Sequence, residues 1–285
     1  MNELGEITDK IVQLLQYDPV SPLIFSSGLF LFLFGGFTFF YQFMRREVML
    51  RIVYVTLFSL YFYYKTSGFF FLLLIAVSVS DFLIGKGIAR SDRQGLRKGL
   101  LALSVALDIG LLIYFKYTNF FIGIVNGLSG HHWLDFQNIF LPVGISFFVF
   151  QSISYTADIY RRRIEPLGMW IDYIFFLSFF PQLVAGPIVR ARDFIPQIRQ
   201  NPLTVTREMF GTGIFLILSG LFKKAIISDY ISLNFVDRVF DDPLLYSGFE
   251  NLMGLYGYAL QIYCDFSGYS DMAIGIALLL GFHFN

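Results

Sequence analysis

Charged side chains are scarce in this sequence. Asp, Glu, Lys and Arg make up 15% of its 285 residues, against roughly 25% in an ordinary soluble domain. Hydrophobic residues make up 56%. Too few charges remain to cover a water-facing globular surface, so lipid must be the solvent for much of the chain.

Cysteine is almost absent as well, and neither sign of charge dominates. The one cysteine, Cys264, excludes an internal disulfide and a cysteine-based metal cluster. Lys and Arg total 21, as do Asp and Glu, so the charge balance gives no reason to expect a nucleic-acid partner. The first residues, Met1–Tyr17, lack the basic start and short apolar core of a cleaved signal peptide. We therefore expect the first apolar stretch to remain in the protein as a helix.

Histidine is scarce too, and the familiar catalytic motifs are missing. The sequence contains no G-x-S-x-G elbow, Walker A loop, G-x-G-x-x-G turn or H-E-x-x-H helix. His131 and His132 lie in a glycine-rich loop, where an adjacent pair without further ligands is a weak metal signal. His283 lies close to the last residue, and a surface position is expected for it. Composition and spacing thus predict neither a catalytic residue nor a metal site.

The chain is instead rich in long apolar runs. No charge occurs between Pro19 and Met44, a stretch long enough to cross a hydrocarbon layer of about 30 Å at about 1.5 Å per residue. Further apolar stretches follow at Val48–Tyr64, Gly68–Ile84, Leu100–Phe115, Ile139–Ala157, Tyr173–Val189, Met209–Ile227, Asn251–Cys264 and Met272–Phe282. Several are short for a full crossing and are expected to be tilted, kinked or re-entrant. The pattern predicts an all-α, polytopic membrane protein in which residues 1–285 form a single transmembrane domain.

Basic residues gather in particular loops, and this asymmetry predicts the topology. Lys and Arg are concentrated at Lys86–Lys98, Arg161–Arg163 and Arg190–Arg207. The positive-inside rule places these loops in the cytoplasm. The N-terminus, with its excess of acids, and the loop with His131 and His132 are then expected outside.

Two of these basic loops flank one apolar stretch, and a single crossing cannot place both on the same side. The stretch contains Pro181, Gly186 and Pro187, and proline removes a helical N–H donor and clashes with the preceding turn. A broken segment that enters and returns on the cytoplasmic side resolves the conflict. Since broken backbone at membrane depth is tolerated only inside protein or against a watery cavity, we expect Phe179–Ile188 to line a cavity. The alternative is a proline-kinked spanning helix, because the orientation rule has exceptions.

The segment Tyr263–Asp271 places two acids and two serines among apolar helices. An acid at membrane depth costs about 2.5–3.5 kcal/mol on insertion scales, so Asp265 and Asp271 should face a cavity or a partner. Their six-residue separation puts them on different helix faces, which argues against a carboxylate dyad. Gly268 is a candidate helix break. The alternative is that Asp265, Ser267 and Asp271 cap helix ends.

Other polar residues in or beside apolar runs have simple explanations. Interhelical hydrogen bonds account for Gln151 and Gln182. Lys223 and Lys224 end an apolar run, where lysine side chains can extend towards the interface. Asp108 lies within the fourth apolar stretch and is a further buried acid.

Four parts of the chain carry distinctive residue patterns: Leu141–Phe148 with Phe150–Tyr155, Phe179–Arg190, Gly220–Lys224 and Asp265–Ala273. These segments resemble signatures of the membrane-bound O-acyltransferase (MBOAT) family, and they are most similar to those of its alginate O-acetyltransferase branch. The resemblance runs from about Leu141 to the last residue. It implies a ring of transmembrane helices with re-entrant segments around a thin central region.

The resemblance also implies a function. It indicates a membrane O-acyltransferase that acetylates a cell-surface or exported polysaccharide such as alginate, in a multi-pass arrangement in the bacterial inner membrane. The acyl group would come from a thioester substrate, acetyl-CoA or an acyl carrier, and no bound cofactor is expected. Expected partners are membrane lipid and a periplasmic or extracellular acetyltransferase. The expected lining of the acyl tunnel is Gln151, Pro181, Gln182, Gly186, Pro187, Asp265, Ser267, Tyr269 and Asp271.

The family's catalytic histidine follows a Trp-Arg-Arg-Trp-His-type motif, which the resemblance places beyond Asn285. His283 matches a different stretch, so no catalytic residue is assigned. The chain, taken as the N-terminal part of such an enzyme, is expected to be incomplete for catalysis on its own. Two alternatives remain. A transporter or channel subunit should show paired repeats, and the sequence shows none. A non-catalytic scaffold would recruit a partner acetyltransferase.

Overall fold

Helices account for the regular structure in the described part of the chain. The computed structural model describes residues 13–19, 21–131 and 133–284. Every element in these ranges is an α-helix, a 3₁₀-helix or a π-helix, which confirms the all-α prediction. The predicted outer positions of the N-terminus and of His132 fall on residues outside these ranges. His283 is exposed, as predicted.

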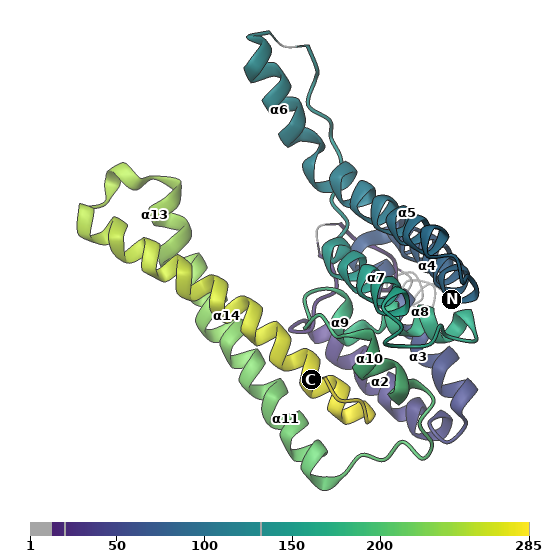
Figure 1. The fold of residues 1–285 in the computed structure, drawn as a ribbon. Coiled ribbons are helices and arrows are strands. Elements are labelled where there is room, and N and C mark those ends of the chain that lie inside the picture. The colour runs from purple at the N-terminus through teal and green to yellow at the C-terminus, as the bar shows by residue number, and fades with distance from the viewer. Residues whose placement is uncertain (1–12, 20, 132, 285) are drawn as a thin grey trace, which may run out of the picture. The chain divides into compact units, whose positions relative to one another are not determined.

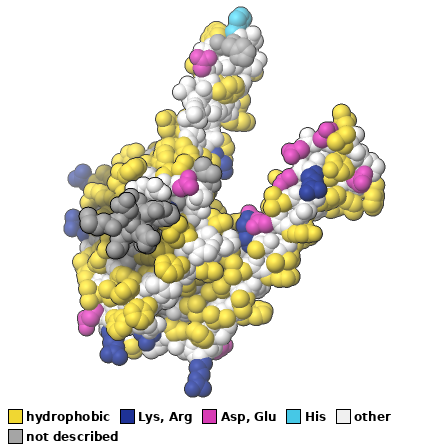
Figure 2. Space-filling model, turned by 180° about the vertical axis from the view of Figure 1, so that it is seen from behind, with side chains coloured by type: hydrophobic (Ala, Val, Ile, Leu, Met, Phe, Trp, Pro, Cys, Tyr) yellow, Lys and Arg dark blue, Asp and Glu magenta, His cyan; other side chains and the backbone are white. Residues whose placement is uncertain are grey.

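The surface of the helices is apolar enough for lipid. Within the described ranges, three helical stretches are long and apolar enough to cross a membrane: Val48–Arg90, Gln94–Ser129 and Arg207–Asp241. The shorter helix α2 (Gly28–Met44) is also apolar. Large side chains such as Phe32 and Phe215 are 79% and 69% exposed, and hydrophobic side chains cover much of the face shown in Figure 2. Lipid is the solvent in which so much exposed apolar area is stable, so the chain is an integral membrane protein.

The chain forms two compact units, and each is described by itself. The first unit comprises the described residues of Met1–Pro22, Met49–Val184 and Ile188–Arg199. The second comprises those of Leu23–Val48, Ala185–Pro187 and Gln200–Asn285. The single transmembrane domain expected for residues 1–285 stays a prediction.

The first unit is a helix bundle with an extended arm. Its elements are α3 (Val48–Ser67), the 3₁₀ turn η1 (Gly68–Phe70), α4 (Phe71–Arg90), α5 (Gln94–Leu112), the π turn η2 (Ile113–Tyr117), α6 (Thr118–Ser129), α7 (Ile145–Tyr160), α8 (Trp170–Ser178), α9 (Phe180–Leu183) and α10 (Ala191–Ile198). Helices α4, α5, α7 and α8 pack against one another around buried Leu74, Val77 and Phe148. Helix α6 extends away from this bundle beyond the π turn (Figure 1).

The second unit is built on two long helices that run side by side, α11 and α14 (Figure 1). Its elements are α2, α11 (Arg207–Leu221), the π turn η3 (Phe222–Ser228), α12 (Asp229–Ile231), the π turn η4 (Ser232–Val236), α13 (Asp237–Asp241), the 3₁₀ turn η5 (Pro243–Leu245) and α14 (Gly248–Leu280). The Tyr41 hydroxyl of α2 donates to the Leu280 carbonyl oxygen at 2.8 Å, which ties α2 to the end of α14.

Glycine pairs bring α11 and α14 into backbone contact. A Cβ atom on Gly220 would collide with the carbonyl oxygen of Gly268, and one on Gly275 would lie 2.6 Å from the carbonyl oxygen of Gly213. Helices in a membrane gain most of their association energy from close packing, and small residues allow that approach. Gly268 is therefore a packing residue. The prediction that it breaks the helix is wrong, because α14 runs unbroken through it.

The N-cap of α14 is Ser247, a residue that the sequence analysis did not consider. Its hydroxyl accepts from the Glu250 amide while the Glu250 carboxylate accepts from the Ser247 amide at 2.8 Å. This reciprocal arrangement is a capping box. Asp265, Ser267 and Asp271 lie inside the same helix, so the alternative that they cap helix ends is wrong.

Candidate functional site

A helix break lies where the sequence predicted one. Helix α8 ends at Ser178, and Phe179 takes a non-helical conformation with ψ of 108° before α9 begins. The Phe180 amide, which would donate to the Phe176 carbonyl oxygen in a continuous helix, donates instead to the Ser59 hydroxyl at 3.1 Å. Pro181 follows in the first turn of α9. The alternative of a continuous, proline-kinked helix is therefore wrong.

Two glutamines satisfy the carbonyl group that the break sets free. The Nε2 atoms of Gln151 on α7 and Gln182 on α9 donate to the Phe176 oxygen at 3.1 and 2.7 Å. Both side chains are buried, and Gln182 Oε1 has no hydrogen-bond partner in the described structure. The two glutamines thus meet at the break, as interhelical hydrogen bonding predicted. Their role in lining a tunnel stays a prediction.

The segment before α7 packs closely on the break. Gly144 has φ of 77°, which favours glycine. A Cβ atom there would also collide with the Leu183 carbonyl oxygen at the end of α9. The segments that begin at Leu141 and at Phe179 therefore meet in space. Gly186 and Pro187 follow α9 in the non-helical stretch that leads to α10.

The two basic loops that flank the break lie together. Arg161 and Arg163 follow α7, Arg190 and Arg192 begin α10, and all four line one cavity of about 280 Å³. A segment that left one end of the bundle and emerged at the other could not bring these loops together. This arrangement supports the expected return of the broken segment. The side of the membrane on which the loops lie stays a prediction.

A buried acid cluster joins the helices of the first unit, and the sequence analysis found only one of its acids. Asp81 on α4 accepts from Ser104 on α5 at 2.7 Å and from Ser152 on α7. The Ser152 hydroxyl also hydrogen-bonds the Tyr173 hydroxyl of α8 at 2.7 Å, and Asp108 on α5 lies close enough to Asp81 for the two carboxyl groups to interact. All of these side chains are buried. Asp81 interrupts an apolar run as Asp108 does, and that signal was available in the sequence.

An ion-pair ladder connects η3 and α14 in the second unit. Lys223 Nζ lies 2.6 Å from Asp271 Oδ2 and donates to Ser267 Oγ at 3.0 Å. Lys224 Nζ lies 2.6 Å from Asp265 Oδ1 and 2.8 Å from Asp229 Oδ1. Both lysines pair with acids, and their extension towards an interface stays a prediction. Since Asp265 and Asp271 bind different lysines, they form no dyad.

Tyr269 packs against Phe25 of the same unit. Its ring stacks on Phe25 with centroids 4.5 Å apart, and its buried hydroxyl has no partner in the described structure. The structure thus brings together three of the four candidate residues on α14. The sequence analysis named both lysines but did not pair them with the acids, because the pairing depends on how η3 packs against α14.

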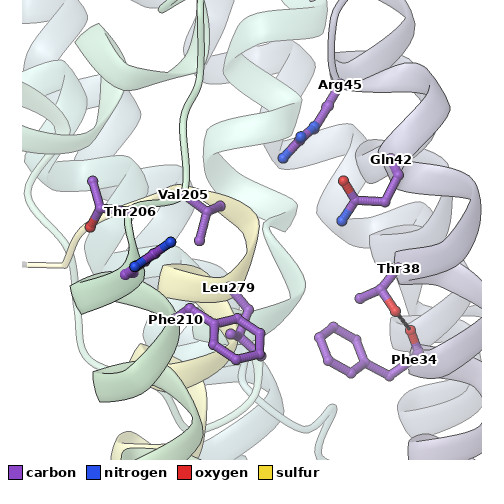
Figure 3. A pocket seen from close by; sticks show the side chains of 9 residues that line it. Phe34, Thr38, Gln42, Arg45, Val205, Thr206, Phe210 and Leu279 are labelled. Atoms are coloured by element: carbon purple, nitrogen blue, oxygen red, sulfur yellow. Dashed lines mark hydrogen bonds between the residues drawn. The ribbon is translucent and has the colours of Figure 1, made fainter.

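An amphipathic groove of about 500 Å³ lies on the same unit, and the sequence analysis did not anticipate it. Figure 3 shows Phe34, Phe210 and Leu279 gathered at one end and the Arg45 and Gln42 side chains towards the other. A groove that is apolar at one end and polar at the other suits an amphipathic molecule such as a lipid.

Apolar helices of membrane-crossing length, with polar groups at a helix break, in a buried cluster and in an ion-pair ladder, define an all-helical integral membrane protein with polar sites among its helices. The chain belongs to the membrane-bound O-acyltransferase family, whose model (MBOAT) matches residues 169–285. That range includes the break and the whole ladder, and it confirms the resemblance predicted from the sequence segments.

Relatives with names that give different substrates match about half of this chain or more. The probable alginate O-acetylase AlgI of Azotobacter vinelandii is 36% identical, over 92% of this chain and 52% of the relative. The peptidoglycan O-acetyltransferase of Helicobacter pylori is 32% identical, over 90% of this chain and 54% of the relative. The teichoic acid D-alanyltransferase of Bacillus subtilis is 27% identical, over 51% of this chain and 37% of the relative. This chain spans about half the length of the O-acetylases that it matches.

Proposed function

We propose that the protein containing this chain is a membrane O-acetyltransferase that acetylates a cell-surface or exported polysaccharide such as alginate. Its donor is a thioester, acetyl-CoA or an acyl carrier, and the acyl group passes across the bacterial inner membrane, which the chain crosses several times. A periplasmic or extracellular acetyltransferase is its expected partner. The observation that carries the proposal is the ladder of Lys223 and Lys224, because it sets paired charges among apolar helices in the range that matches the acyltransferase family model.

The reaction defines what such a site must supply. The acceptor hydroxyl attacks the thioester carbonyl carbon, a C–O bond forms, the C–S bond breaks, and the hydroxyl proton reaches the departing thiolate through a base. We assign no residue of this chain as that base. The ladder supplies fixed donors: each ammonium group has three N–H bonds, and two contacts are seen for each of Lys223 and Lys224. A donor held in a low-dielectric site polarises a carbonyl oxygen with little reorganisation.

The helix break supplies a second polar surface. Within the described residues, Gln182 Oε1 is buried without a hydrogen-bond partner, and Gln151 shares the carbonyl acceptor of Gln182 Nε2. A polar group left unpaired inside a bundle costs free energy unless a ligand or water meets it. We propose that Gln182 forms part of the wall of the acyl path, where a passing ester or thioester meets polar atoms on an otherwise apolar lining.

Deletion of the gene in its own host tests the proposal. The extracellular polysaccharide is purified from the wild type, the deletion strain and the complemented strain, and ester-linked acetyl groups are counted against sugar protons by ¹H NMR. Loss of acetyl groups from a polysaccharide that is still exported is the expected result. Loss of the polysaccharide itself would favour a transporter subunit, and unchanged acetylation would contradict the proposal.

A further inference from the structure

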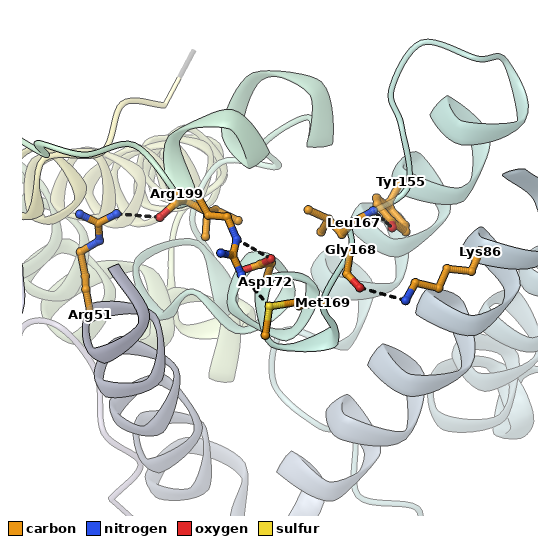
Figure 4. Close-up of polar contacts among 9 residues, drawn as sticks. Arg51, Lys86, Tyr155, Leu167, Gly168, Met169, Asp172 and Arg199 are labelled. Carbon is orange, nitrogen blue, oxygen red and sulfur yellow. Dashed lines mark hydrogen bonds and ion pairs between the residues drawn. The ribbon is translucent and has the colours of Figure 1, made fainter. Parts of the chain in front are cut away.

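Some arginines of this chain support the fold, and others have no internal partner. Figure 4 shows two of the first kind: Arg51 donates to the carbonyl oxygen of the last residue of α10 at 2.8 Å, and Arg199 lies 2.8 Å from Asp172. Arg46 and Arg207 form neither an ion pair nor a side-chain hydrogen bond within the described part of the chain. Both are exposed, so their charges can meet a ligand.

Each of these two arginines marks the end of an apolar helix. Helix α2 carries no charge before its C-cap, Arg45, and Arg46 follows directly. Helix α11 begins at Arg207 and carries no charge after Glu208. Basic residues at the ends of membrane helices lie at the level of the lipid headgroups. Because the end of α2 and the start of α11 line the same groove, these two headgroup-level ends lie side by side within the second unit.

The polar end of the groove gathers positive charge. The groove of about 500 Å³ is lined by Arg45 from the end of α2 and by Arg207 from α11. A second space of about 300 Å³ shares Arg45 with it and adds Arg46. None of the described residues that line either space is acidic, and Glu47 and Glu208, which follow two of the arginines in the sequence, line neither. Three guanidinium groups without a lining carboxylate favour an anionic ligand.

The other end of the groove is apolar. Phe34, Phe210 and Leu279 gather there (Figure 3), and Phe210 is 57% exposed. The Thr38 hydroxyl between the two ends is already used, since it donates to the Phe34 carbonyl oxygen at 2.9 Å. A ligand that fills this groove must therefore carry an anionic group at one end and hydrocarbon at the other. A free phosphate would leave the apolar end empty.

The walls of the groove are held by contacts within the second unit. The Tyr41 hydroxyl of α2 donates to the Leu280 carbonyl oxygen of α14 at 2.8 Å. Thr206 caps the start of α11, where its hydroxyl accepts from the Met209 amide at 3.1 Å. The positive end of the α11 dipole adds to the charge of the arginines. A ligand thus meets a site that is largely formed in advance.

We propose that this groove binds one anionic glycerophospholipid, with its phosphodiester among Arg45, Arg46 and Arg207 and its acyl chains against the apolar end. The guanidinium group matches phosphate oxygens with two parallel hydrogen bonds, and basic pockets between transmembrane helices commonly bind acidic lipid headgroups. The lipid bridges α2 and α11, which are far apart in the sequence, and so stabilises the second unit by linkage. This inference is independent of the proposed function.

Lipid binding by the purified full-length protein tests the proposal. The protein is kept in a nonionic detergent and titrated with phosphatidylglycerol, and native mass spectrometry gives the number of bound lipids and the Kd. Arg207→Gln is expected to raise the Kd about tenfold or more, since it removes a charge-assisted contact. Arg46→Gln should raise the Kd in the same direction, so the result does not depend on a single variant. The matched control is Arg93→Gln, which makes the same change at an exposed position outside the groove and should leave the Kd unchanged.

The choice of ligand separates headgroup charge from hydrocarbon. The wild type should bind phosphatidylglycerol about tenfold or more tightly than phosphatidylcholine, whose cationic headgroup offsets the phosphate charge. Phosphatidylglycerol should also raise the apparent melting temperature of the wild type and of Arg93→Gln, but not that of Arg207→Gln. Equal Kd values for the wild type and Arg207→Gln, or for the two lipids, would overturn the proposal. So would equally tight binding of sn-glycerol 3-phosphate, which has no hydrocarbon and would make the groove a site for soluble anions.

Discussion

Replacing Lys223 alone should lower the free energy of unfolding far more than replacing both Lys223 and Asp271. The two side chains are 28% and 19% exposed, with Nζ and Oδ2 2.6 Å apart. The variant Lys223→Met leaves the Asp271 carboxylate with its main partner gone in an apolar region. Loss of one partner of a buried pair costs about 3–5 kcal/mol, and an acid at the centre of a membrane helix costs about 2.5–3.5 kcal/mol. Because Asp271 keeps some exposure, we expect about 3 kcal/mol.

The double variant Lys223→Met with Asp271→Leu separates stability from function. Replacing an ion pair by apolar residues of similar volume is often neutral or stabilising, so the double variant should regain stability to within about 1 kcal/mol of the wild type. Asp265→Asn provides a milder comparison, since the Asp265 side chain is 53% exposed and exposed pairs contribute about 0–1 kcal/mol. Apparent melting temperatures in detergent should therefore be close together for the wild type, the double variant and Asp265→Asn, and clearly lower for Lys223→Met.

Acetylation of the host polysaccharide is then measured with the same variants in the chromosomal gene. If the ladder takes part in acyl transfer, the double variant should insert normally and still fail to restore acetyl groups. Full acetylation by the double variant would refute the functional part of the reasoning and make the ladder a structural element. Equal stability of the single and double variants would refute the electrostatic part.

Three further predictions concern the helix break and the cap of α14. Gln182→Leu should lower the free energy of unfolding by about 1 kcal/mol. The double variant Gln151→Leu with Gln182→Leu should lower it by about 1–3 kcal/mol more than the sum of the single changes, because the Phe176 carbonyl oxygen then loses both donors. A double-mutant cycle of unfolding measures this difference. Gly144→Ala should lower the yield of folded protein strongly, since the added methyl group meets both positive φ and a backbone oxygen, and thermal unfolding should detect it. Hydrogen bonds from Ser247 lower the pKa of Glu250 below its ordinary value of 4.5. The ionised carboxylate should therefore stabilise the first turn of α14 fully above pH 4.5, and this stabilisation should be lost as the pH falls through the lowered pKa. Hydrogen exchange of the first turn, compared with Glu250→Gln, checks the sign.

The sequence predicted those features that depend on local chemistry. Composition was sufficient for an all-helical membrane protein, and Pro181 was sufficient for the break after α8. The conflict between the two basic loops also predicted that the broken segment returns, and the cavity that both loops line supports this return, because charge asymmetry reports on membrane topology more directly than on fold. In each case the evidence lies within a few residues of the feature that it predicts.

Features that depend on packing between helices were predicted poorly. Gly268 was interpreted as a helix break because an isolated glycine weakens a helix, whereas its partner Gly220 lies on another helix. The lysines of η3 were not paired with Asp265 and Asp271, because these acids lie on a different helix, α14. A sequence pattern was available for the glycines, since Gly213 and Gly220 on α11 have the same spacing as Gly268 and Gly275 on α14. Matching spacings on two apolar helices would have favoured a packed pair over a break.

The helix break after Ser178 and the cavity lined by Arg161, Arg163, Arg190 and Arg192 depend on each other for stability. The chain returns to the cavity only because α8 stops at Ser178, and the stop is tolerated only because Ser59, Gln151 and Gln182 satisfy the groups it exposes. The return brings four guanidinium groups together, which opposes the fold through like-charge repulsion. The buried contacts at the break must therefore hold the loops against that repulsion, and an anion in the cavity would relieve it. Any ligand that binds the folded cavity and not the unfolded chain should stabilise the first unit by linkage, so occupancy of the cavity and integrity of the break are expected to change together.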